Sequence, residues 1–162
     1  MTDTDTFGES ERLRFLTGMV RLEAMYLAQT DGRLFAVPLD RERLDRLAET
    51  PDISERVDAF VARLSRLQDG VADKLLPALL RLLAEPVGPT IDNLNRAERF
   101  GWLPSAEAWL ACRQLRNRLI HEYINDAERL AAALNEAHTA VPLLLATAAA
   151  LVAESDRRRG VA

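Results

Sequence analysis

Apolar residues recur along most of this 162-residue chain at spacings of three and four, the period of an amphipathic helix. The first repeat predicts a helix from Glu11 to about Gln29, which the turn signal Thr30-Asp31-Gly32 is expected to end. The following apolar run, within residues 33–39, is expected to form an ordered loop, because a strand there would have no partner to pair with.

The next segment predicts a short helix and then a long one. Asp40 can cap a helix that runs through Glu49. Asp52-Ile53-Ser54-Glu55 has the pattern of a capping box, and apolar residues continue from there to Leu83 at helical spacing. Gly70 and Pro77 are expected to bend this long helix.

The rest of the chain predicts three more helices. These cover residues 91–100 after a cap at Thr90, residues 105–123, and residues 126–155 with a kink at Pro142. Short connections between substantial helices favour an all-α fold, an up-and-down four-helix bundle with additional short helices. The length suits one domain over residues 1–162, whose ends, 1–10 and 156–162, are expected to fray.

Charge and composition narrow the classes of function. The formal net charge of −4 argues against a broad basic surface that coats nucleic acid, so any binding of phosphate must be local. Twenty of the 21 basic residues are arginine, whose planar guanidinium binds phosphate directionally. Cys112 is the single cysteine, no stretch is apolar enough to suggest a membrane span, and the N-terminus is acidic. These features favour a cytoplasmic protein with no membrane partner.

Residues 116–123, Arg-Asn-Arg-Leu-Ile-His-Glu-Tyr, bring together the groups best suited to phosphate chemistry. Arg116 offers a permanent charge for phosphate oxygens, and His121 can transfer a proton near neutral pH. Arg113 is a further basic residue on the same predicted helix. The simplest interpretation of Tyr123 is structural: its ring packs at the end of the helix and its hydroxyl group lies in water.

Helical geometry separates the two principal groups of this motif. Arg116 falls in an apolar stripe with Trp109 and Cys112, so it is expected to meet an acid, line a polar cleft or face a second subunit. His121, five residues later, points about 140° away from Arg116 around the helix. A homodimer whose motif helices meet across a two-fold axis would bring both kinds of side chain into one cleft.

The motif resembles the Arg-x4-His-x-Tyr motif of HepT-type proteins in the HEPN (higher eukaryotes and prokaryotes nucleotide-binding) superfamily. Arg116, Asn117, His121 and Tyr123 occupy its positions, and residues 94–109 are also similar to the approach to the motif in HepT-like chains. The resemblance covers residues 90–125, whereas the first half of the chain is similar only in being helical.

The resemblance implies a homodimeric four-helix bundle that acts as a metal-independent endoribonuclease, commonly the toxin of a toxin–antitoxin pair. In that interpretation His121 is the general acid or base and Arg116 stabilises the phosphate, while Asn117 and Arg113 support them. The substrate is RNA, with tRNA as one candidate, and no cofactor or metal is needed. The resemblance also implies an MNT-type nucleotidyltransferase antitoxin that inactivates the toxin by transferring AMP onto Tyr123.

Other interpretations of the sequence remain open. The chain is also consistent with a non-catalytic nucleotide- or substrate-binding partner of a nucleotidyltransferase, or with a helical adaptor in which Arg116 forms an interface salt bridge. A catalytic zinc site is disfavoured, because Asn125 stands where a zinc-protease helix has its second histidine. His138, the only other histidine, is expected on the surface of the last helix.

Overall fold

The computed structural model describes residues 3–121 and 126–160, with side chains from Phe7 onward. Regular structure in these ranges is entirely helical, which confirms the predicted all-α class. The elements in chain order are α1 (Asp3–Leu34), α2 (Arg41–Asp45), the 3-10 turn η1 (Leu47–Glu49), α3 (Pro51–Asp69), the π turn η2 (Gly70–Leu75), α4 (Leu76–Leu82), α5 (Thr90–Arg99), α6 (Ala106–His121) and α7 (Ala127–Arg158).

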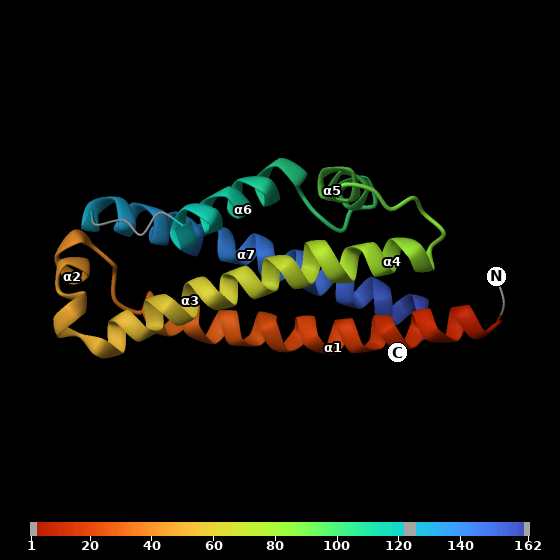
Figure 1. Cartoon of the computed structure of the whole chain (residues 1–162), viewed down its shortest axis with the longest axis horizontal. Helices are drawn as coiled ribbons and strands as arrows, with labels where there is room; N and C mark the ends of the chain where they lie inside the picture. The colour runs from red at the N-terminus through yellow and green to blue at the C-terminus, as the bar shows by residue number, and fades with distance from the viewer. Residues whose placement is uncertain (1–2, 122–125, 161–162) are drawn as a thin grey trace.

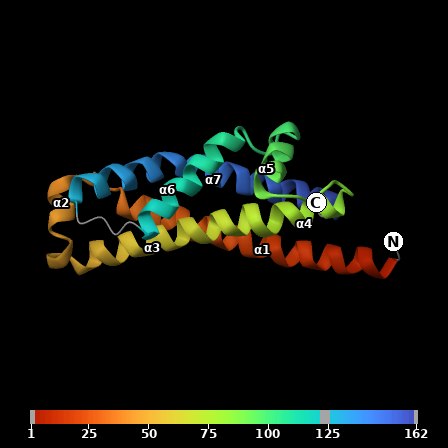
Figure 2. The ribbon, with the colours of Figure 1, turned by 45° about the horizontal axis from the view of Figure 1, so that its top comes forward.

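The long helices run roughly along one axis, whereas α5 lies across them (Figures 1 and 2). Helix α1 packs against α3 and α7, and α6 also packs against α3 and α7. Helices α1 and α6 do not contact each other within the described residues, so they occupy opposite sides of the α3 and α7 pair. The core therefore lies between four long helical segments and is made mainly of leucine, valine and alanine.

Helix α1 is longer than its sequence pattern predicted. The predicted stop at residues 30–32 is wrong, because the helix continues to Leu34. Leu27 and Leu34 are both fully buried, seven residues apart on the same face, and burying Leu34 requires the helical backbone to continue. Phe35 N then donates to Asp31 O at 3.0 Å. Gly32 is tolerated inside the helix because tertiary packing outweighs its low propensity.

Of the predicted starts at Asp40, residues 52–55 and Thr90, the first is correct and the other two are wrong. Asp40 caps α2 as predicted, and its carboxylate accepts from Arg43 N at 2.9 Å. The helix does not run through Glu49 as predicted, because it ends at Asp45 and the 3-10 turn Leu47–Glu49 follows. The predicted capping box at residues 52–55 is wrong, because α3 begins at Pro51, whose missing N–H and fixed φ suit the first helical position. The predicted cap at Thr90 is also wrong, since Thr90 is the first residue of α5.

The long third segment is interrupted where a bend was predicted. Gly70 ends α3 and begins the π turn η2, after which α4 continues from Leu76. Gly70 is buried, and a Cβ there would overlap Oε2 of Glu23 on α1. Glycine therefore permits the close approach of α1 to η2 at this point.

Helix α7 begins after Asp126, whose carboxylate accepts from Glu128 N at 3.0 Å. By length and composition alone α7 is long and apolar enough to cross a membrane. In this structure it contributes buried residues such as Leu134, Leu144 and Leu151 to the core and packs against α1 and α6. Helices α1 and α7 also extend into the end segments that were expected to fray, from Asp3 and up to Arg158.

Candidate functional site

Helix α6 carries the motif and is firmly anchored at its N-terminal end. Ser105 precedes it, and the Ser105 hydroxyl accepts from Ala108 N at 3.1 Å. The helix buries one face in the core, with Trp109, Cys112, Leu115 and Leu119 as its largest side chains there. The opposite face is left for solvent or for a ligand.

Arg116 lies at the edge of the buried face and is paired within the chain. Its side chain is only 12% exposed, and Nη1 donates to Oδ1 of Asp69 on α3 at 2.5 Å. Nε and Nη2 both donate to Oδ1 of Asn117, at 3.2 and 3.1 Å. Of the three outcomes that the sequence left open for this arginine, the described residues show the first, an acid as its partner.

Arg113 forms a second bridge one turn earlier on α6. Its Nη2 lies 2.8 Å from Oδ2 of Asp73, and its Nη1 lies 3.3 Å from Oδ1 of the same carboxylate. Asp69 and Asp73 are four residues apart, and Gly70, where the π turn begins, lies between them. The two arginine–carboxylate pairs therefore connect α6 to both sides of the point where the long third segment changes its helical winding.

The buried side-chain amide of Gln68 adds a further contact between α3 and α6. Gln68 is 2% exposed, and its Nε2 donates to the carbonyl oxygen of Cys112 at 3.2 Å. The Oε1 atom of Gln68 and the Nε1 atom of Trp109 are buried without a hydrogen-bond partner within the described residues. No local pattern singles out Gln68, Asp69 or Asp73, because they lie in the middle of an ordinary amphipathic helix pattern.

His121 is the last residue of α6, and its side chain is exposed. Asn117 is exposed one turn before it, so the two side chains are neighbours on the outer face of the helix. Arg118 points in another direction and forms a bridge of 3.6 Å to Glu136 on α7. Asn117 thus stands between the arginine that is paired with α3 and the exposed histidine.

The position of Tyr123 lies outside the described residues, as do Glu122, Ile124 and Asn125. Among the described residues the site consists of Arg113, Arg116, Asn117 and His121. The two arginines are paired with carboxylates, whereas Asn117 and His121 are exposed. Cys112 sits beneath them as a buried free thiol, and burial together with the charge of Glu136 raises its pKa above the ordinary 9.0. That cysteine is therefore protonated at neutral pH and serves packing instead of nucleophilic chemistry.

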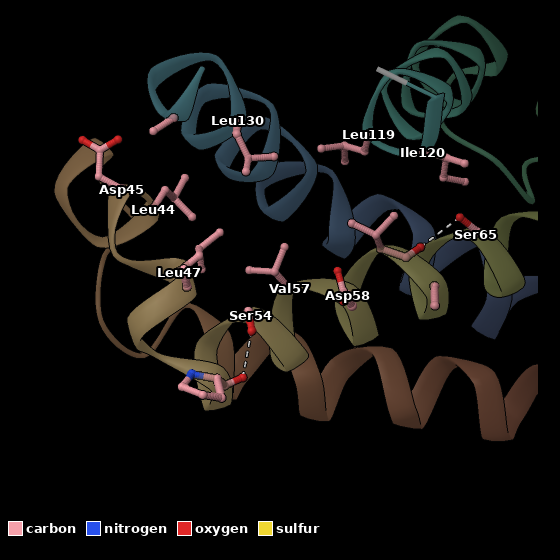
Figure 3. Close-up of a pocket in the computed structure, with 15 residues that line it drawn as sticks. Leu44, Asp45, Leu47, Ser54, Val57, Asp58, Ser65, Leu119, Ile120 and Leu130 are labelled. Atoms are coloured by element: carbon pink, nitrogen blue, oxygen red, sulfur yellow. Dashed lines mark hydrogen bonds between the residues drawn. The ribbon is translucent and has the colours of Figure 1, made fainter. Parts of the chain in front are cut away.

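A cavity of about 930 Å³ lies beside the end of α6, bounded by α2, η1, α3 and α7 (Figure 3). Its described lining is mainly apolar and includes Leu47, Val57 and Ile120, with the carboxylates of Asp45 and Asp58 added. This volume is within the range of small-molecule sites. The two carboxylates would repel a phosphate, so the cavity suits an uncharged or cationic group. Its lining residues resemble ordinary core positions in the sequence.

His138 makes two specific side-chain contacts, with Asp31 and with Phe35. Its Nδ1 lies 2.6 Å from Oδ1 of Asp31, and its ring stacks on Phe35 with centroids 4.1 Å apart. The side chain is nonetheless 44% exposed, in agreement with its predicted place on the outside of the last helix. It joins α7 to the C-terminal end of α1.

Comparisons with protein-family models, with curated proteins and with solved structures found no match to this chain. The resemblance to HepT-type proteins therefore depends on the motif residues themselves and on the chemistry they can perform.

Proposed function

We propose that this chain is a metal-independent endoribonuclease of the HEPN type and the toxin of a toxin–antitoxin pair. His121 transfers the proton, Arg116 stabilises the phosphate, and Arg113 and Asn117 support them. The protein acts in the cytoplasm on a structured RNA, with tRNA as a candidate. The acidic net charge favours a substrate held at one local site over a long track of RNA.

The way Arg116 is held carries the proposal. Asp69 fixes the guanidinium through Nη1, whereas the edge formed by Nε and Nη2 contacts a single neutral oxygen of Asn117. That edge presents the fork with which arginine takes two phosphate oxygens. A phosphate needs to displace only an exposed amide from this edge, while Asp69 keeps the guanidinium in place.

The reaction needs only groups that RNA and the motif supply. The imidazole of His121 removes the proton from the ribose 2′-hydroxyl, and that oxygen forms a bond to phosphorus. The bond from phosphorus to the 5′-oxygen breaks, and the leaving oxygen takes up a proton from water. The guanidinium of Arg116 stabilises the charge that develops on the phosphate oxygens. The products are a 2′,3′-cyclic phosphate and a 5′-hydroxyl end.

A second copy of α6 completes the site in this proposal. Arg116 is directed to α3, whereas His121 is exposed on the outer face, so one helix does not present both to one phosphate. Two α6 helices related by a two-fold axis place the arginine of one copy near the histidine of the other.

Regulation in this proposal falls on Tyr123, which lies outside the described residues. An MNT-type nucleotidyltransferase antitoxin transfers AMP from ATP to its hydroxyl group and releases pyrophosphate. The added nucleotide carries negative charge close to the motif, where it competes with RNA for the arginine.

The test compares purified wild type with the His121→Ala and Arg116→Ala variants on structured RNA in the presence of EDTA. Loss of a proton-transfer group is expected to slow cleavage by about 100-fold to 10,000-fold. His138→Ala serves as the matched control, since it removes the chain's other histidine away from the motif. Cyclic phosphate ends that disappear only in the two motif variants support the mechanism, and equal cleavage by all four proteins rules it out.

One observation favours the alternative of a non-catalytic nucleotide-binding partner over the enzyme. Nη1, Nη2 and Nε of Arg116 all have partners already, as expected of an arginine with a structural role. A nucleotide-binding companion of a nucleotidyltransferase would then hold a nucleotide through the exposed amide of Asn117 without cleaving RNA. Binding of a nucleotide that His121→Ala leaves unchanged, together with no cleavage by wild type, would select this alternative.

A further inference from the structure

Helix α1 has two apolar faces, and the core uses only one of them. Its buried face carries Leu13, Leu16, Val20, Leu27 and Leu34. The outward face exposes large apolar side chains, with Phe15 at 70%, Leu22 at 49% and Met25 at 45%. Phe7 and Tyr26 are exposed beside them. Contiguous apolar surface of this extent on a soluble domain marks an interaction site.

The outward positions follow a heptad repeat. The two core positions of that repeat are occupied by Gly8, Phe15, Leu22 and Gln29 in one series, and by Glu11, Gly18, Met25 and Gly32 in the other. We call these eight residues the α1 stripe. All of them are exposed except Gly18, which is half-buried. Three of its eight residues, Phe15, Leu22 and Met25, are large and apolar. The stripe therefore has the spacing of a coiled-coil seam, and no other described element of this chain covers it.

The packing of the residues that the structure describes does not explain the glycines of the stripe. A Cβ added at Gly8, Gly18 or Gly32 would meet nothing within 4 Å. Alanine would suit an exposed helix better at each position, because glycine weakens a helix. A surface depression of about 630 Å³ lies at Gly18 and is lined by residues that include Phe15 and Leu22. Such a hole between two large side chains fits an inserted side chain from another helix.

We propose that the α1 stripe packs against the α1 stripe of a second copy, with the two helices antiparallel. In an antiparallel coiled coil the first core position of one helix faces the second core position of the other. The register in which the two residue numbers add to 40 pairs Phe15 with Met25, and Leu22 with Gly18. Leu22 of each copy then enters the depression at Gly18 of the other, as an isologous interface requires.

The polar residues of the stripe select this arrangement. In the same register Glu11 faces Gln29, an acceptor opposite a donor. A shift of one heptad places Glu11 opposite Leu22, or Gln29 opposite Gly18. A parallel pair would set Glu11 against Glu11, and like charges at that distance repel.

The exposed area is sufficient for a second copy. Aromatic side chains cover about 150–250 Å² each, so the exposed parts of Phe7, Phe15, Leu22, Met25 and Tyr26 amount to roughly 500 Å². Two copies would bury about 1,000 Å² in total, which is the lower limit for a specific interface. This pairing does not rest on the proposed ribonuclease function, and it leaves α6 open on the opposite side of each copy.

Solution mass tests the proposal. Leu22→Glu is expected to halve the mass of the wild-type particle in sedimentation equilibrium, with the helical circular dichroism unchanged. If α6 also pairs, the change is from tetramer to dimer, and otherwise it is from dimer to monomer. Val37→Glu, an exposed apolar residue outside the stripe, is the matched control and should leave the mass unchanged. A monomeric wild type, or a Leu22→Glu variant with the wild-type mass, overturns the proposal.

Disulfide trapping tests the register. In a Cys112→Ala background, a mixture of the Phe15→Cys and Met25→Cys variants is expected to form a covalent dimer on oxidation, whereas neither variant does so alone. The facing positions lie within the reach of a disulfide only in the antiparallel register. A covalent dimer from Phe15→Cys alone would show a parallel pair and contradict the proposal. This outcome is independent of RNA cleavage, so it stands or falls separately from the enzyme.

Discussion

Helices α6 and α1 pack on opposite sides of the same two partners, α3 and α7, and they leave different kinds of residue outside the core. On α6 they include the arginines Arg113, Arg116 and Arg118, each of which has a carboxylate partner within the chain. On α1 they include large apolar side chains among the charged ones, and the described residues provide no cover for Phe15 or Leu22.

This difference means that the two faces would bind their partners by different physical processes. A ligand at α6 must compete with groups that are already bonded, so binding there is an exchange of partners and depends on how firmly each partner is held. A partner at α1 has only water to displace, so association there is driven by burial of apolar surface. The following predictions test the two halves of this comparison, from the largest expected effect to the smallest.

The exchange at α6 can be blocked by a charge. Asn117→Asp replaces the neutral oxygen on the Nε and Nη2 edge of Arg116 with a carboxylate, which holds the guanidinium more firmly and repels phosphate. Affinity for RNA is expected to fall at least about tenfold, a free-energy change of about 1.4 kcal/mol. Fluorescence anisotropy with a labelled RNA measures it. Asn117→Ala, which vacates the same edge without adding a charge, should lose less affinity than Asn117→Asp, and a loss of equal size in both variants would contradict the exchange.

The two bridges of α6 should differ in their contribution to stability. Asp69→Asn weakens a bridge in which the arginine is 12% exposed and the carboxylate 46% exposed, whereas Asp73→Asn weakens one in which they are 27% and 35% exposed, so the two variants differ in how deeply the arginine is buried. The expected loss is about 1–2 kcal/mol for Asp69→Asn and below about 1 kcal/mol for Asp73→Asn. Urea denaturation of both variants measures the difference. Equal losses would mean that the burial of Arg116 does not strengthen its bridge.

Glu23 on α1 differs from the paired carboxylates beside α6. Among the residues that the structure describes, Oε2 of Glu23 is buried without a hydrogen-bond partner. Burial raises the pKa of Glu23 above the ordinary 4.5, the charge of Asp69 adds to this, and Lys74 and Arg66 oppose it. Because the pKa is raised in the folded state, the folded protein binds the proton more tightly, and the charged form of Glu23 destabilises the fold at neutral pH.

Glu23→Gln should therefore raise the melting temperature slightly at pH 7. The advantage over wild type should shrink as the pH falls through the raised pKa and vanish below about 4.5, where Glu23 is protonated in both states. Thermal melts at several pH values measure this. Glu154 provides the contrast. Burial raises its pKa, but hydrogen bonds from Arg157 and Arg158 lower it by more, so that the pKa lies below the ordinary 4.5. Glu154→Gln should accordingly destabilise at pH 7, and a stabilising effect there would break the comparison.

Much of the fold could be predicted from local patterns. The all-α class was predicted from the helical spacing of apolar residues. The cap at Asp40 and the restart at Asp126 were predicted because a carboxylate can accept from the free N–H groups of a helix start, whereas the same rule failed at Asp52, since the helix begins at Pro51. The stop predicted at Asp31-Gly32 failed, because a turn signal is a local preference and the burial of Leu34 outweighs it. The motif residues Arg113, Arg116, Asn117 and His121 were selected from the sequence, but their partners on α3 and η2 were not.

The sequence by itself determined the helical class and the residues of α6 that could perform phosphate chemistry, since periodicity and side-chain type are local properties. Only the tertiary structure decided that Asp69 and Asp73 meet Arg116 and Arg113, because residues forty or more positions apart are brought together by the packing of α3 against α6. It also decided which of the two apolar faces of α1 enters the core. A helix with apolar residues on both sides has no local preference between them, and the choice depends on the shapes of the neighbouring helices.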